Sequence, residues 1–429
     1  MTLVLVVLFG LMLLGIPVAF AILSAGMAYL ATTGGSMLVV AQRLIYGLNS
    51  FTLLAVPLFI LVGNLMDFGG ISKRLTDWAK SILGWLPGGL GIVTVFSCAI
   101  FAALTGSGPA TVAAIGSIML PSMLKAGYSK DTSAGLVASA GALGPIIPPS
   151  IPMIIYGVTM NLSIPAMFMA GVIPGLVIAL ALSLVNVVFA YRNPEVLKHA
   201  KTMKFDFKES MKLFWKALGA LGLPILILGG IYGGIFTPTE SAAVGIVYAL
   251  ILGFALKELK IKDLPKILIN SLKTSTMVNF IIAAASLFSW VVSKSQIGTA
   301  ISNAFISFVG GSQALYLFVL VVVLLIVGCL MDNVAATLIL APILIPVGIA
   351  LGCNELHIGM LFCICLVVGF VTPPFGYNLF TAVSISGLNF KQIVKGSLPF
   401  LLTEILLLFV FAYVPGIITW LPRLMGYGY

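Results

Sequence analysis

Charged residues are scarce in this sequence. Asp, Glu, Lys and Arg together make up 8% of the 429 residues, whereas soluble globular domains carry roughly 25%. Hydrophobic residues make up 61%, and the mean hydropathy is +1.20. A soluble fold could not bury so much apolar surface, which excludes a soluble enzyme, a nucleic-acid-binding protein and a disordered chain. The composition predicts a protein whose solvent is the lipid bilayer.

Histidine and cysteine are also few. Two histidines exclude a His-rich metal site, and no spacing among the five cysteines matches a zinc site. The apolar segments contain no paired aspartates, no Ser–His pair and no His-Glu-x-x-His string. We therefore expect neither an enzyme nor a resident cofactor, and we look for function in the way the chain crosses the membrane.

Apolar runs of roughly 20 residues predict single membrane crossings. Seven clear runs are Thr2–Leu30, Arg43–Asp67, Ser163–Tyr191, Leu213–Ile235, Ser241–Leu256, Thr274–Ser293 and Gly396–Leu421. No basic segment precedes the first run, which is also too long for a cleaved signal, so we expect a retained helix there.

Two regions are too long for one crossing. Residues 81–124 contain no charged side chain, and a Thr-Gly-Ser-Gly-Pro string at 105–109 interrupts them. Residues 295–331 and 333–354 form a similar pair around Asp332. Each region predicts either two full crossings or a re-entrant hairpin of two shorter helices, and the sequence leaves both open.

Two further segments are predicted to be interrupted helices. Asp131–Met160 is broken at 144–149 and Leu356–Leu388 at 369–374, and each break holds a Pro-Pro pair. Proline removes a backbone donor and clashes with a preceding carbonyl, so the helix unwinds. Because unpaired backbone groups are costly in hydrocarbon, we expect both breaks to be buried in protein or to line a cavity.

Lysine and arginine indicate the orientation. With the N-terminus placed in the cytoplasm, 19 of the 22 Lys and Arg residues fall inside, and only Arg43, Lys294 and Arg423 fall outside. This distribution follows the positive-inside rule. The first long region then opens to the cytoplasm and the second to the outside.

A shift of 225 residues superimposes the two long regions and the two interrupted helices. Matching positions are Pro121 and Pro346, Gly127 and Gly352, Gly144 and Gly369, and Pro148-Pro149 and Pro373-Pro374. The shift also places Ser107 on Asp332. Together with the opposite orientation it predicts an inverted repeat, and inverted repeats with broken helices are typical of secondary transporters.

The tips of the long regions and the breaks supply candidate ligands for a hard monovalent cation such as Na⁺. The first predicted sodium site comprises Thr105, Ser107, Gly108, Gly144, Ile147 and Pro148. The second comprises Gly328, Asp332, Asn333, Thr372 and Pro374. Small residues admit an ion, hydroxyls add neutral oxygens, and a carboxylate at that depth is a functional candidate. Small-residue helix packing at the first site, and a helix cap or ion pair at the carboxylate, are the alternatives.

Half-helix N-termini at the breaks present free N–H groups to an anionic substrate. The substrate candidates are Thr111, Pro149, Ser150 and Asn378. Glu240 follows a Thr-Pro-Thr turn, where capping the next helix and a role in gating or partner docking are both open. Glu404 lies inside the last apolar run, where it could pair with another helix or be a stability element.

Five strings carry a resemblance to a known family: 106–111 (GSGPAT), 141–151 (GALGPIIPPSI), 236–241 (FTPTES), 331–333 (MDN) and 372–378 (TPPFGYN). Over essentially its whole length the chain resembles the large membrane subunit of tripartite ATP-independent periplasmic (TRAP) transporters, of the DctM or SiaM type. The resemblance implies an all-α polytopic membrane protein. It would be an inverted-repeat transporter with two re-entrant helical hairpins and two interrupted helices, elevator type and similar to the ion-transporter superfamily.

The resemblance also implies a division of the chain. Residues 1–85 would be N-terminal scaffold helices with an interfacial segment, 86–162 the first transport-domain repeat, 163–294 scaffold helices with cytoplasmic amphipathic segments, 295–390 the second repeat and 391–429 the C-terminal helix.

Function and partners follow from the resemblance as expectations. The chain would be a subunit of the bacterial inner membrane that imports an organic anion, such as a sialic acid or a C4-dicarboxylate, with Na⁺ as the coupling ion. A periplasmic substrate-binding protein would deliver the anion. Because the sequence begins directly with the first crossing, we expect the small four-helix membrane subunit to be a separate chain. A stand-alone Na⁺/dicarboxylate symporter and a channel are the alternatives.

Overall fold

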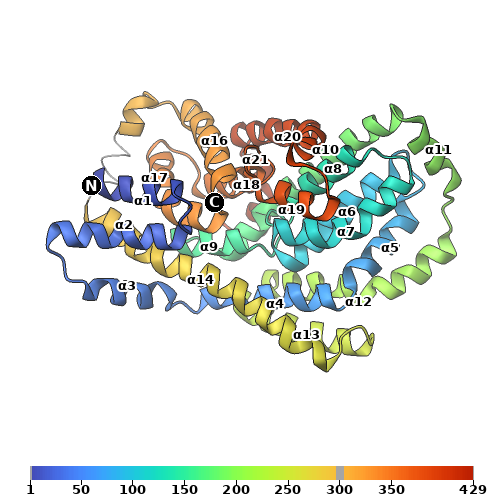
Figure 1. The fold of residues 1–429 in the computed structure, drawn as a ribbon, viewed down its shortest axis with the longest axis horizontal. Helices are drawn as coiled ribbons and strands as arrows, with labels where there is room; N and C mark the ends of the chain where they lie inside the picture. The colour runs from blue at the N-terminus through green and yellow to red at the C-terminus, as the bar shows by residue number, and fades with distance from the viewer. Residues whose placement is uncertain (1, 296–303, 429) are drawn as a thin grey trace.

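The computed structural model describes residues 2–295 and 304–428, and all regular structure in these ranges is helical (Figure 1). The chain begins with α1 Thr2–Leu13, α2 Val18–Thr33, α3 Leu38–Leu48, η1 Thr52–Leu54, α4 Ala55–Phe68 and α5 Ile71–Leu83. The first predicted repeat holds α6 Gly89–Thr105, α7 Gly108–Lys125, α8 Lys130–Gly141 and α9 Ile151–Met160.

The middle of the chain holds α10 Ile164–Tyr191, α11 Pro194–Thr202, α12 Phe207–Tyr232, α13 Pro238–Ala255, η2 Ile261–Asp263 and α14 Leu264–Lys294. The second predicted repeat holds α16 Gln313–Leu330, α17 Asn333–Ala350, α18 Glu355–Gly369 and α19 Tyr377–Ser386, before α20 Phe390–Tyr413 and α21 Gly416–Leu424. Residues 296–303, at the start of the predicted second repeat, lie outside the described ranges.

Seven helices within the described ranges are long and apolar enough to cross a membrane. They are α10, α12, α13, α14 with η2, α16, α17 and α20. Helices α10, α12, α13, α14 and α20 confirm five of the predicted single crossings. The protein is therefore a multi-pass membrane protein.

Of the other two predicted single crossings, the first is wrong, and the second is a bent helix pair, either one broken span or a re-entrant segment. Residues 2–30 form two helices, α1 and α2, that pack on each other, because Gly15 takes a φ of 79° and Pro17 ends the first helix and starts the second. Residues 43–67 are bent by 69° between α3 and the helical segment that begins at Thr52. Neither interruption involves a charge, which is why the apolar runs look continuous in the sequence.

The two long regions each form a pair of helices joined by a short tip. Hairpin 1 is α6 and α7, with tip 1 at Gly106 and Ser107; hairpin 2 is α16 and α17, with tip 2 at Met331 and Asp332. Ser107 and Asp332 are the N-cap residues of α7 and α17, so the shift of 225 residues superimposes the two caps. The structure thus confirms the internal repeat at the level of single helix ends.

The interrupted helices are also confirmed. Break 1, residues 142–150, separates α8 from α9, and break 2, residues 370–376, separates α18 from α19. Each break contains a cis peptide bond within its Pro-Pro pair.

Helix α20 shows that the two repeats point in opposite directions. Near its start, Gly396 lies against the backbone of Asp131, which opens α8. Near its end, the carbonyl of Phe411 accepts a hydrogen bond of 2.8 Å from Nε2 of His357, which opens α18. The fifteen residues between these contacts rise by about 22 Å. Helices α8 and α18 therefore enter the protein from opposite ends of α20.

The lysine-bearing loops gather at one end of the molecule, here named the lysine-rich end. Arg74 after the α4–α5 corner pairs with Glu258 of the α13–α14 loop at 3.1 Å. Asn193 at the start of α11 donates to the carbonyl of Gly127, between α7 and α8, at 3.1 Å. The first contact joins the α4–α5 corner to the α13–α14 loop, and the second joins the base of hairpin 1 to α11, which lies on the right of Figure 1.

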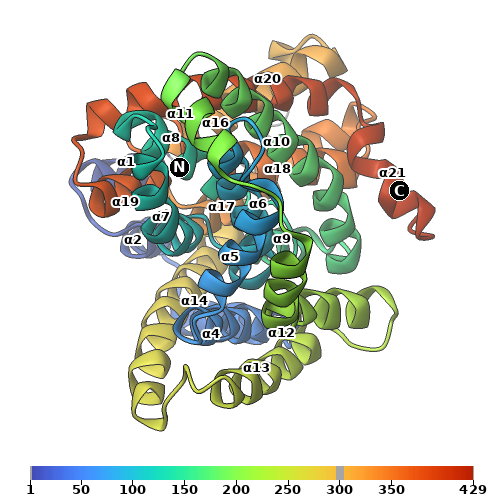
Figure 2. The same ribbon diagram turned by 90° about the vertical axis from the view of Figure 1, so that its right-hand side faces the viewer.

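The helices fall into two layers. Helices α2, α3, α4, α12, α13 and α14 pack on one another, and Figure 2 shows α4, α12, α13 and α14 below the rest. The hairpins, the broken helices, α10 and α20 form the other layer. Helix α5 contacts both layers through α12 and α6, and Lys80 on it donates to Ser122 Oγ of α7 at 3.0 Å.

Candidate functional site

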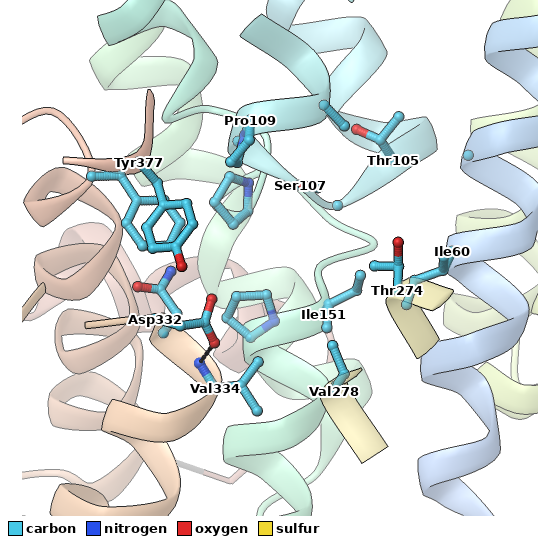
Figure 3. Close-up of a pocket in the computed structure, with 18 of the residues that line it drawn as sticks. Ile60, Thr105, Ser107, Pro109, Ile151, Thr274, Val278, Asp332, Val334 and Tyr377 are labelled. Carbon is cyan, nitrogen blue, oxygen red and sulfur yellow. Dashed lines mark hydrogen bonds between the residues drawn. The ribbon is translucent and has the colours of Figure 1, made fainter. Parts of the chain in front are cut away.

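A cavity of about 400 Å³ lies where the two layers meet (Figure 3). Both hairpin tips reach it, although the hairpins open toward opposite ends of the protein. Tip 1 is buried at Gly106 and Thr105, so hairpin 1 turns inside the protein. The tips therefore meet in the interior, which confirms re-entrant hairpins rather than two pairs of full crossings.

Four helix N-termini converge on this cavity. Gly108 of α7, Ile151 of α9, Asn333 of α17 and Tyr377 of α19 are each the first residue of their helix, and each lines the cavity. The first N–H groups of a helix have no partner inside that helix, and the end carries roughly half a positive charge. Such an arrangement attracts a negatively charged group.

Tip 1 is built from neutral oxygens. Thr105 Oγ1 lies 3.2 Å from Thr111 Oγ1, which donates to the carbonyl of Ser107 at 2.8 Å. Gly106 turns the chain with a φ of 60°, and a Cβ there would lie 2.9 Å from the carbonyl oxygen of Pro149. Tip 1 is thus pressed against break 1, with hydroxyls and carbonyls at the contact.

Tip 2 carries a carboxylate and an amide. Asp332 Oδ1 accepts a hydrogen bond of 2.8 Å from the N–H of Val334, the dashed line in Figure 3, so it caps α17 while also lining the cavity. Asn333 is 2% exposed, and neither polar atom of its amide has a hydrogen-bond partner among residues 2–295 and 304–428. A buried unpartnered amide in a cavity calls for a ligand. Its oxygen and the carboxylate are hard donors that suit Na⁺.

A matching glycine in each interrupted helix lies against the hairpin of its own repeat. A Cβ on Gly144, in break 1, would lie 2.5 Å from the carbonyl oxygen of Ser107 in tip 1. A Cβ on Gly369, at the end of α18, would lie 2.5 Å from the backbone of Gly328 in α16, shortly before tip 2. Only glycine allows these close approaches.

The predicted sodium-site residues separate into two groups. Thr105, Ser107, Gly108, Asp332 and Asn333 line the cavity. The others are not among its lining residues: Gly144, Ile147, Pro148, Gly328, Thr372 and Pro374. The breaks contribute Pro145 and Phe370 to the lining instead, so the tip and the break of each repeat reach the same cavity.

The four substrate candidates do not line the cavity. Thr111, Pro149, Ser150 and Asn378 are all buried. Ser150 Oγ donates to the carbonyl of Pro145 at 2.6 Å and caps α9. Their assignment to the substrate stays a prediction.

Four polar cavity residues were not among the predicted site residues: Tyr377 of α19, and three that lie outside the repeats. Asn64 and Asp67 of α4 and Thr274 of α14 line the cavity from the other layer. Asn64 Nδ2 donates to Ser271 Oγ of α14 at 2.8 Å, which ties the two helices together. The spacing of three residues puts Asn64 and Asp67 on one helix face, a signal that was readable in the sequence.

The two singled-out glutamates have different surroundings. Glu240 accepts bonds of 2.8 Å from both the N–H and the hydroxyl of Thr237 and forms a capping box, which confirms the capping role. Gating or docking by Glu240 stays a prediction. Glu404 is 1% exposed, and neither carboxylate oxygen has a hydrogen-bond partner within the described residues. The pairing with another helix considered for Glu404 is therefore not seen there.

Comparisons with known proteins agree with this architecture. A family profile described as "Tripartite ATP-independent periplasmic transporter, DctM component" matches residues 5–417. The chain is 39% identical over 411 residues to the isethionate TRAP transporter permease protein DctMQ of Oleidesulfovibrio alaskensis, covering 95% of this chain and 64% of that one. It is 38% identical over 405 residues to the C4-dicarboxylate TRAP transporter large permease protein DctM of Pseudomonas aeruginosa, covering 94% of each.

A solved structure shares the fold. The YdaH transporter of Alcanivorax borkumensis matches with a TM-score of 0.62, covering 94% of this chain and 89% of that chain, at 14% sequence identity. At that identity the likeness concerns the fold alone.

Proposed function

The chain belongs to the DctM family of TRAP transporters, a family of permeases rather than enzymes, and from this premise we propose that it imports an organic anion coupled to Na⁺. The anion is of the sialic acid or C4-dicarboxylate type. The coupling ion, Na⁺, binds at two cation sites. The layer that contains the hairpins and the broken helices moves as an elevator against the other layer.

One observation carries the proposal: four helix N-termini converge on a cavity whose lining residues include no Lys, Arg or His. The N-termini favour an anion, whereas the carboxylates of Asp332 and Asp67 in the same cavity oppose one. A cation bound at Asp332 removes the part of that repulsion that comes from tip 2. Substrate and Na⁺ then stabilise each other, which is the reciprocal coupling that symport needs.

The first sodium site is proposed between tip 1 and break 1, at Thr105, Ser107, Gly108, Gly144, Ile147 and Pro148. The second is proposed between tip 2 and break 2, at Gly328, Asp332, Asn333, Thr372 and Pro374. The glycine contacts between tip and break, and the unpartnered amide of Asn333, support these placements. Thr111, Pro149, Ser150 and Asn378 stay the proposed substrate residues for a state in which the tips have moved.

The shape of the cavity supports an elevator in its inward-facing state. One wall comes from the hairpin tips and the other from α4 and α14 of the second layer. Along α4 the lining runs from Ile60 to Asp67, and along α14 from Ile281 to Thr274. Both runs lead toward the lysine-rich end, so the cavity reaches toward that end.

We place the protein in the bacterial inner membrane with its lysine-rich end in the cytoplasm, as the positive-inside rule requires. Because α1 and α2 fold back on each other, the start of α1 then lies at the periplasmic end (Figure 1). The predicted cytoplasmic N-terminus depended on a single first crossing, which the structure replaces with two helices.

The proposed partners are a small four-helix membrane subunit and a periplasmic substrate-binding protein. Membership of a tripartite family supports both, since the chain supplies one of three components. Glu240, exposed at the end opposite the lysine-rich loops, is the proposed docking or gating residue on that side.

Uptake into proteoliposomes tests the proposal. The chain is reconstituted with its small subunit, and the binding protein supplies labelled C4-dicarboxylate or sialic acid under an inward Na⁺ gradient. Uptake should stop when K⁺ replaces Na⁺, and undiminished uptake in K⁺ would refute sodium coupling. Uptake without the binding protein would instead support a stand-alone symporter.

A further inference from the structure

Asn378 is fixed to break 2 by its backbone and to the first repeat by its side chain. Its N–H donates to the carbonyl of Phe370, at the start of break 2, at 3.0 Å. Its Nδ2 donates to the carbonyl of Ala138 in α8 at 3.1 Å. The side chain is 0% exposed. A residue of the second repeat is therefore built into the core of the first.

The same side chain touches tip 1. A Cβ on Gly108, the first residue of α7, would lie 2.8 Å from Asn378 Oδ1. A Cβ on Gly141, just before break 1, would lie 3.3 Å from Asn378 Nδ2. The amide thus fills the space between the start of α7 and the end of α8, next to the contact of tip 1 with break 1. In the part of the chain that the structure describes, its Oδ1 has no hydrogen-bond partner, and it lies beside the N-terminus of α7, where helix N–H groups are unpaired.

This bridge runs in one direction only. Helix α19 packs on α7 of hairpin 1, and α9 packs in the same way on α17 of hairpin 2. The residue of α9 that matches Asn378 under the shift of 225 is Met153, an apolar side chain whose Cε lies 2.5 Å from the position of a Cβ on Gly171 in α10. The second hairpin therefore receives no matching polar bridge from this position.

Tyr377, the preceding residue, completes the connection. It lines the cavity that Asp332 also lines, and Figure 3 shows its hydroxyl on the side of Asp332. Its ring lies 5.5 Å from that of Phe370 in break 2. At the start of α19, Tyr377 thus faces tip 2 and Asn378 faces the start of hairpin 1's second helix, α7. A shift of break 2 would therefore displace both residues.

We propose that Asn378 is a positioning residue that makes the geometry of tip 1 depend on that of break 2, and so makes cation binding at the first site cooperative with binding at the second. The inference rests on the proposed function, since it concerns the two proposed sodium sites. Ordering of break 2 by a cation at Asp332 holds α19 in place. Asn378 then holds Gly108 and break 1 at the distance from each other that a cation at the first sodium site needs.

The sodium dependence of uptake tests this coupling. Two strongly coupled sites give a Hill coefficient approaching two, and uncoupled sites give about one. We expect a coefficient above one in the wild type that falls toward one in Asn378→Ala and Asn378→Ser, with a several-fold higher half-saturating Na⁺ concentration. Ser384→Ala, an exposed change on the same helix whose hydroxyl bonds only to Thr381 within α19, is the matched control and should leave both values unchanged. A wild-type coefficient retained in the Asn378 variants would overturn the proposal.

A double substitution separates direct contact from general damage. Gly108→Ala should reduce uptake because its Cβ meets Asn378 Oδ1, and Gly108→Ala with Asn378→Ala should recover part of the loss, since the smaller side chain makes room. Strictly additive losses would contradict the contact. Wild-type uptake indifferent to Na⁺ would defeat the proposed function, whereas the double substitution would still decide whether Asn378 positions tip 1. Thermal unfolding of each purified variant identifies misfolded ones, and Asn378→Ser takes the place of Asn378→Ala if the latter is unstable.

Discussion

The two hairpins share a backbone plan but differ in the chemistry of their tips. Ser107 and Asp332 are the N-caps of α7 and α17 at matching positions. Only Asp332 uses its side chain to cap, with Oδ1 accepting from Val334. Tip 1 instead relies on neutral hydroxyls and on an amide from the opposite repeat. Tip 2 thus carries a charged side chain of its own, Asp332. Tip 1 has neutral hydroxyls, and the amide that contacts it comes from Asn378 in the other repeat.

This difference teaches that an internal duplication can keep its geometry while its two sites diverge. Gly144 and Gly369 are the same residue in both repeats because a Cβ at either position would lie 2.5 Å from backbone of the hairpin of the same repeat. The residues at the caps are free to change. We therefore expect charge removal to affect the second site most, and steric change at the glycines to affect both sites alike.

The largest effect is expected for Asp332→Ala. Removing one partner of a buried charged interaction costs about 3–5 kcal/mol, and losing the cap adds about 1 kcal/mol. Uptake should fall by at least about 100-fold while membrane insertion stays intact. Initial uptake rates and the amount of protein in membranes measure the two. Normal transport by this variant would show that the carboxylate only caps α17.

Gly144→Ala and Gly369→Ala come next. A Cβ at either position meets backbone of the hairpin in the same repeat, and overpacking costs about 1–3 kcal/mol. Uptake should fall roughly 5- to 150-fold in both variants. Gly229→Ala on α12, where a Cβ meets nothing within 4 Å, is the control and should transport normally. If only one of the two variants lost uptake, the two breaks would not be functionally equivalent.

The smallest effect is expected for Ser107→Ala. A single neutral hydroxyl contributes about 0.5–1.5 kcal/mol, so the half-saturating Na⁺ concentration should rise by roughly 2- to 10-fold with little change in maximal rate. A sodium titration of uptake measures both. An unchanged titration curve would remove this hydroxyl from the first site.

Local rules predicted the breaks and the tips because proline and glycine act through their own backbone. The Pro-Pro pairs at 148–149 and 373–374 interrupt helices wherever they occur, and the glycine at 106 turns the chain. The same rules were insufficient for α1 and α2, since Gly15 and Pro17 lie within one long apolar run. Hydropathy measures how much chain is apolar, not whether that chain folds back.

Some cavity residues could likewise be predicted from the sequence, and others could not. Asp332 stood out because a charge in an apolar region is rare, and it lines the cavity. Asn64, Asp67 and Thr274 line it too, but they belong to helices about 200 residues apart in sequence that meet only through packing. Asn378 was predicted to be a substrate residue, which stays a proposal, and only the fold shows its side chain between the start of α7 and the end of α8.

Composition, charge placement and the 225-residue shift by themselves determined that the chain lies in a membrane and holds two inverted copies with broken helices. These features follow from solvation and from backbone chemistry, which act on each segment separately. The tertiary structure alone decided that the hairpins turn inside the protein, that four helix ends share one cavity, and which side chains cross between repeats. Such contacts join segments far apart in the chain, and their partners are selected by shape and packing, which no local pattern encodes.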